Sequence, residues 1–77
     1  MRYVVIKHTN NGETDHVEVV CVAATKSIAY KQILMTAEEY YEAYKVLEDS
    51  QYYKRFTDQF NEKLIEIELH EAPLIDW

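Results

Sequence analysis

The segment 64–71 alternates between apolar and polar side chains more strictly than any other part of the chain. Its central residues are, in order, Ile65, Glu66, Ile67, Glu68, Leu69 and His70. Because successive side chains of a strand point to opposite faces, this pattern predicts a β-strand with one face in the core and one in water. A strand of this kind needs further strands beside it and a layer that covers its apolar face.

A hairpin is expected near the N-terminus, where the segments 3–9 and 15–24 are rich in β-branched residues and flank Asn10, Asn11 and Gly12. These three residues have the turn chemistry of a hairpin. If Asn11 and Gly12 form a two-residue turn, one apolar face results. Its expected members are Ile6 facing Val17, Val4 facing Val19, and Cys21 continuing the same side.

The opposite face of this hairpin is expected to be mixed. There Lys7 would pair with His16, and Val5 with Glu18. Three further residues, Tyr3, Val20 and Val22, keep part of this second face apolar.

Two helices are predicted between the hairpin and the last strand. Thr25 or Ser27 can cap the first, in which apolar residues recur at steps of three and four. This stripe consists of Tyr30, Ile33, Ala37, Tyr40, Tyr44 and Leu47. Two alternatives remain open: the capping-box pattern at 36–39 can begin a new helix, and the segment 28–35 also fits a strand.

The second predicted helix begins at Asp49 and Ser50, which can cap it, and ends near Lys63. Tyr53, Phe56 and Phe60 would share one of its faces. The predicted element order is therefore β-β-α-α-β. This is an α+β fold in which a small antiparallel or mixed sheet, made of the N-terminal hairpin and the C-terminal strand, packs on two helices.

A chain of 77 residues has room for one core, so residues 1–77 are expected to form a single domain. Residues 72–77 form an apolar C-terminal tail, which contains Pro73 and is expected to pack on the domain or on a partner. Cys21 is the only cysteine, which favours a reducing compartment such as the cytoplasm. No apolar run approaches the ~20 residues that a membrane span needs.

The negative charge lies in the second half of the chain. The net charge is −6: residues 1–36 contribute +1 and residues 37–77 contribute −7. Phosphate backbones and anionic lipid repel such a chain, whereas a basic protein surface attracts it. We therefore expect a protein partner with a basic surface, and no direct contact with nucleic acid or membrane.

No motif of an enzyme, metal site or cofactor site is recognised. The spacing of His8, His16 and His70 fits no zinc pattern, and Gly12 alone cannot build a phosphate-binding loop. Cys21 lies in an apolar run, where a buried thiol is inert. His8 can sit across the hairpin from Asp15, and a cross-strand ion pair is the simplest reading of that placement.

The excess of acidic residues leads to the first functional hypothesis. Glu66 and Glu68 would lie about 6.6 Å apart on one face of a strand, close to the spacing of successive phosphates on a nucleic-acid strand. The chain is similar, in size and composition only, to small acidic inhibitors of phages and mobile elements that occupy nucleic-acid-binding surfaces of host proteins. The expected partner-binding residues are Glu38, Glu39, Glu42, Tyr41, Glu66, Glu68 and Trp77.

The second hypothesis is a homo-oligomeric structural or accessory protein, possible as a homodimer. It would assemble through the second face of its sheet and through the C-terminal tail, because exposed sheet edges and apolar faces favour symmetric association. The residues expected to be buried in this way are Tyr3, Val20, Val22, Leu74, Ile75 and Trp77.

Overall fold

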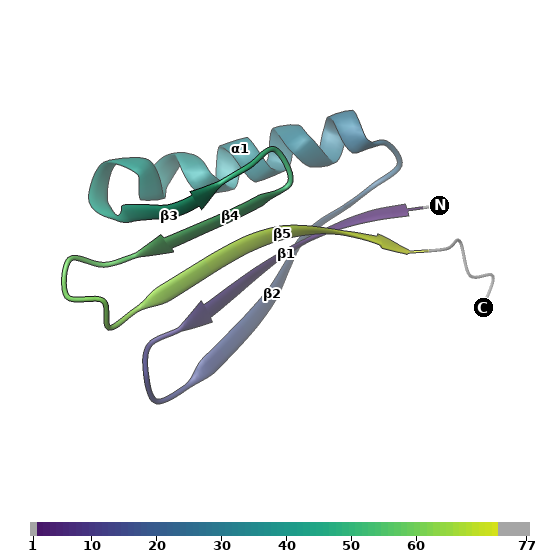
Figure 1. Cartoon of the computed structure of the whole chain (residues 1–77). Helices are drawn as coiled ribbons and strands as arrows, with labels where there is room; N and C mark the ends of the chain where they lie inside the picture. The colour runs from purple at the N-terminus through teal and green to yellow at the C-terminus, as the bar shows by residue number, and fades with distance from the viewer. Residues whose placement is uncertain (1, 73–77) are drawn as a thin grey trace.

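The computed structural model describes residues 2–72, which form one sheet and one helix in the order β-β-α-β-β-β (Figure 1). The elements are β1 (Arg2–Asn10), β2 (Asp15–Ala23), α1 (Lys26–Ala43), β3 (Lys45–Asp49), β4 (Tyr53–Thr57) and β5 (Leu64–Ala72). The five strands are ordered β2-β1-β5-β4-β3, and all neighbours run antiparallel. Helix α1 lies on one side of the sheet, here called the helix-covered face, and leaves the other side as the open face.

The predicted second helix is wrong, because its residues form the turn after β3, the strand β4 and the loop that leads to β5. Ser50 does not cap a helix: its backbone N–H and its hydroxyl both donate to the carbonyl oxygen of Tyr53, at 3.0 and 2.8 Å, and close a turn. Phe56 is fully buried, whereas Phe60, the third member of the predicted stripe, is 69% exposed. The predicted packing on two helices is thus replaced by five antiparallel strands and one helix within residues 2–72.

Helix α1 is continuous from Lys26 to Ala43, so the segment 28–35 is helical and no new helix begins at 36–39. Thr25 is its N-cap, and the Thr25 hydroxyl accepts a hydrogen bond from the backbone N–H of Ile28 at 3.2 Å. The buried residues of α1 recur at steps of four and three. They are Ala29, Ile33, Ala37 and Tyr40. Leu47, assigned to this stripe by the sequence pattern, lies in β3.

The β1–β2 hairpin closes through the longer loop 11–14. The Asn11 side chain accepts hydrogen bonds from the backbone N–H groups of Glu13 and Thr14, at 3.1 and 2.9 Å. The register therefore differs from that of a two-residue turn by two positions, and Ile6 pairs with Val19. A register shift next to Val5 and Ile6 then carries Cys21 to the other face, where it pairs with Val5.

The buried face of the hairpin is the one that the sequence pattern predicts to be mixed. Val5 is fully buried under α1, together with Ile65, Ile67 and Phe56 from the neighbouring strands. The register of β1 with β5 explains this choice, since Ile6 pairs with Glu68 and shares a face with it. A helix over Ile6 would also bury the carboxylates of Glu66 and Glu68, and removing charged groups from water is costly.

Candidate functional site

The open face has an apolar half on β1 and β2. Within it, Val4 pairs with Val22 and Ile6 pairs with Val19, and Val17 lies next along β2. The three β2 valines are exposed by 63% (Val17), 58% (Val19) and 53% (Val22). We call these five residues the valine patch.

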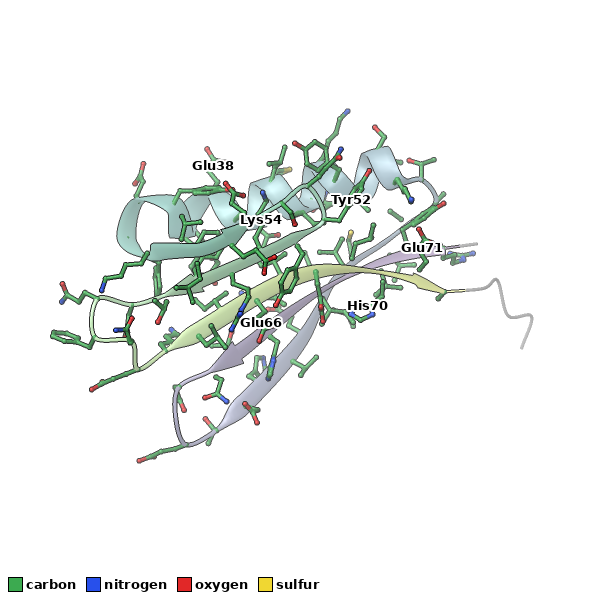
Figure 2. All side chains as sticks on the ribbon, in the orientation of Figure 1. Glu38, Tyr52, Lys54, Glu66, His70 and Glu71 are labelled. Atoms are coloured by element: carbon green, nitrogen blue, oxygen red, sulfur yellow. The ribbon has the colours of Figure 1, made fainter. Side chains whose placement is uncertain are left out.

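The polar half of the open face lies on β5 and β4, and its carboxylates have partners within the chain. The Tyr53 hydroxyl donates to Glu66 Oε2 at 2.9 Å, and His70 Nε2 lies 2.9 Å from Glu68 Oε1. Figure 2 shows Glu66 and His70 on the side of the sheet away from α1. Burial first, and then the hydrogen bond to Glu66, raise the pKa of Tyr53, so its hydroxyl keeps its proton at neutral pH.

His8 links the two halves of the open face. Its Nε2 lies 3.4 Å from Asp15 Oδ1, so the predicted contact between these side chains is present, although it is diagonal, because His8 pairs with Val17 and Asp15 with Asn10. Its Nδ1 lies 4.0 Å from Glu66 Oε1 on the other side. Two carboxylates flank this imidazole, but no hydroxyl or thiol contacts it among the described hydrogen bonds, so the pair orients a ring without a nucleophile beside it.

The predicted partner-binding residues do not form one surface. Glu38, Glu39 and Glu42 lie on α1, whereas Glu66 and Glu68 lie on the open face, on the opposite side of the sheet (Figure 2). The three helix carboxylates are exposed and make no ion pair within residues 2–72. Trp77, Leu74 and Ile75, which were assigned to an interface from the sequence, lie outside the described residues.

Tyr41, another expected contact residue, instead helps to hold the β3–β4 hairpin against α1. Its hydroxyl donates to Asp49 Oδ1 at 2.8 Å, and its ring packs edge-on against Phe56 at 5.3 Å between centroids. Lys54, which Figure 2 shows on the helix side, donates to the same Asp49 and to the Ser50 carbonyl oxygen at 3.1 Å. We call Tyr41, Asp49 and Lys54 the hairpin network.

The charges of the hairpin network stabilise one another. Burial opposes the charge of Lys54, but hydrogen bonds to Asp49 and Tyr41 outweigh it and raise the pKa of Lys54. The hydrogen bond from Lys54, and next that from Tyr41, lower the pKa of Asp49. These shifts follow from a structural ion pair between Lys54 and Asp49.

The valine patch contains Ile6, Val17 and Val19, which the sequence pattern placed together on the apolar face of the hairpin, and the structure leaves this face uncovered. Two residues expected on an exposed second face, Tyr3 and Val20, are instead partly buried and packed against the core. The pairing of Ile6 with Glu68 carries the signal that identifies the open face. These two residues are 62 positions apart in the chain, so the sequence of the hairpin alone does not identify the open face.

Nothing in the part of the chain that the structure describes groups three or more His, Cys, Asp or Glu side chains so that they could hold a metal ion. Nor does any helix within residues 2–72 have the length and apolarity to cross a membrane. Comparison of the chain with models of known protein families, with curated proteins and with solved structures finds no match. The fold and its surfaces define a small α+β domain with one face of its sheet exposed, and function is argued from that geometry.

Proposed function

We propose that the chain is a non-enzymatic protein-binding domain of the cytoplasm, and that the open face of its sheet is its binding surface. The exposure of the valine patch carries this proposal. Burial of one valine side chain contributes about 1.5–3 kcal/mol, so three adjacent valines that are more than half exposed offer a partner a large gain. Contiguous exposed apolar residues with a polar border are typical of protein interaction sites.

The polar half of the open face suits the border of such an interface. Glu66 accepts a hydrogen bond from Tyr53, and Glu68 Oε1 lies 2.9 Å from His70 Nε2, so each carboxylate keeps a polar contact within the chain when a partner covers it. Interfaces commonly have an apolar centre and a polar rim with hydrogen bonds. A cytoplasmic location is proposed because Cys21 is the sole cysteine of the chain.

A matched pair of variants tests the open face. Val19→Lys places a charge in the centre of the valine patch, and Met35→Glu places one on α1, where Met35 is 65% exposed. Tagged wild-type and variant chains are used to capture proteins from a lysate of the cells that express the chain. We expect the wild type and Met35→Glu to capture a protein that Val19→Lys does not capture. This protein can be another copy of the chain. Equal retention by Val19→Lys would dismiss the open face as the binding surface.

A second candidate function uses the acidic side of α1. Glu38, Glu39 and Glu42 are exposed and free of ion pairs within the described range, so they suit a basic surface, including one that normally binds nucleic acid. Glu38→Lys with Glu42→Lys should abolish capture of such a partner. The control variant, Glu13→Lys with Glu62→Lys, changes the net charge by the same amount at exposed loop positions. It should still capture the partner. Capture that persists in the helix variant, or that is insensitive to salt, would contradict this candidate.

A further inference from the structure

We propose that the open face binds the open face of a second copy of this chain, so that two sheets stack and the two helices lie on the outside of a symmetric dimer. This inference rests on the proposed function, because it names the partner of the same surface. The valine patches of the two copies meet at the centre. A self-complementary patch of this kind is the basis of an isologous, two-fold interface.

The size of the valine patch indicates a broad and flat partner. The patch spans about 17 Å along the strands and ~10 Å across two of them, whereas a stable interface covers about 800 Å² of each partner. The partner must therefore cover the polar half as well. The domain measures 44 × 25 × 15 Å, so a second sheet of the same dimensions spans the whole face, while a single helix or strand does not. Stacked sheets pack about 10 Å apart with interdigitating side chains.

The distribution of charge favours a second copy over a basic partner. The open face carries both signs, with Lys45 and Arg55 near Glu48, Glu66 and Glu68 on adjacent strands. The unpaired carboxylates of α1 lie on the other side of the molecule. When the open faces stack, the α1 carboxylates of one copy are therefore far from the α1 carboxylates of the other. A strongly basic partner would be drawn to α1 instead, because the exposed, unpaired acids of Glu38, Glu39 and Glu42 are there.

Arg55 supplies a hydrogen-bond donor for this interface. It lies between Glu48 and Glu66 in the sheet register, and its guanidinium makes no ion pair within residues 2–72. Its Nε is buried inside the domain and is not available to a second copy. Arginine is enriched at interfaces because its fork of N–H groups fits carboxylates and carbonyls. In the dimer, the second copy provides acceptors for the terminal N–H groups of Arg55.

Sedimentation equilibrium on the full chain, between about 1 μM and about 1 mM, tests the dimer. We expect a mass that rises with concentration toward twice the monomer mass of 9.2 kDa. Val19→Lys should weaken association at least about tenfold, and Met35→Glu should leave it unchanged. Far-UV circular dichroism of both variants verifies that the fold is retained. A monomer at every concentration, or equal association of Val19→Lys and the wild type, would overturn the inference.

A mixed-label NMR sample distinguishes stacked faces from pairing of the free β2 edges. Stacking predicts intermolecular NOEs between Val19 methyl groups and aliphatic side chains of the second copy. A dimer without these NOEs, in which the outward amides of β2 become protected, would mean edge pairing and would refute the stacked arrangement.

The two proposals fail separately. If the chain is a monomer but still captures a protein from the lysate in a Val19-dependent manner, only the dimer is refuted. The open face then binds a different protein. A monomer with no Val19-dependent capture removes both the dimer and the open-face function.

Discussion

The ammonium group of Lys54 lies against the carboxylate of Asp49, but the Lys54 side chain is 5% exposed and the Asp49 side chain 44%. The two partners should therefore respond differently to substitution. Asp49→Ala leaves a buried cation without its carboxylate and should reduce the free energy of unfolding by about 1–3 kcal/mol. Lys54→Met keeps the buried volume and leaves Asp49 in contact with water, so it should cost less than about 1 kcal/mol. Urea unfolding measures both, and a larger loss for Lys54→Met would contradict this assignment.

Acid should remove the contribution of the same ion pair. The pKa of Asp49 is lower in the folded protein than in the unfolded chain, so its stabilisation is present above the unfolded pKa and is lost as the pH falls through the folded value. The stability difference between the wild type and Asp49→Asn should thus be largest near neutral pH and shrink below about pH 4. Thermal unfolding at several pH values measures it. Glu42→Gln, at an exposed helix position, is the control, and a difference that grows in acid would refute the prediction.

The two faces of the N-terminal hairpin should differ in their contribution to stability. Val5 is fully buried under α1, so Val5→Ala should cost about 2 kcal/mol through lost burial and the cavity that remains. Val17 is 63% exposed, so Val17→Ala should change the stability of the monomer by no more than about 0.5 kcal/mol. Urea unfolding at low protein concentration compares them. A larger loss for Val17→Ala would mean that the helix covers the other face, and equal losses would contradict the predicted difference.

The N-cap of α1 offers a test at neighbouring residues. Thr25→Ala removes the hydroxyl that accepts from the backbone N–H of Ile28, and should cost about 1 kcal/mol. Ser27 is exposed within the first turn and its hydroxyl makes no hydrogen bond within the described range, so Ser27→Ala should be nearly neutral. Thermal unfolding measures the stability of both variants. A greater loss of stability for Ser27→Ala than for Thr25→Ala would contradict the assignment of Thr25 as the N-cap.

Patterns that are long or strictly periodic were sufficient to predict their elements. The alternation around Ile65 and Ile67 predicts β5, and the capping residue Thr25 with the stripe through Ile33 and Tyr40 predicts α1. The five-residue strands β3 and β4 were missed, because a short segment with Tyr53 and Phe56 three positions apart fits a helix as well as a strand. Only the turn made by Ser50 separates the two readings.

The open face could not be predicted from local sequence for a different reason. Both faces of the hairpin carry valines, so the pattern around Val5 and Val19 does not say which face the helix covers. That choice follows from the register of β1 with β5, which sets Ile6 beside Glu68. The predicted acidic site does not assemble for a different reason: the helix covers the face of β5 that carries Ile65 and Ile67, so Glu66 lies on the face opposite to that of Glu38.

The place of β5 in the sheet has a consequence for folding kinetics. Both hairpins consist of strands that are neighbours in sequence, but β5, which follows them all, lies between β1 and β4 and joins the two halves. During synthesis the β1–β2 and β3–β4 hairpins must therefore wait, each with an unpaired inner edge, until β5 leaves the ribosome. Such a non-local closing step slows folding and exposes strand edges to aggregation in the interval.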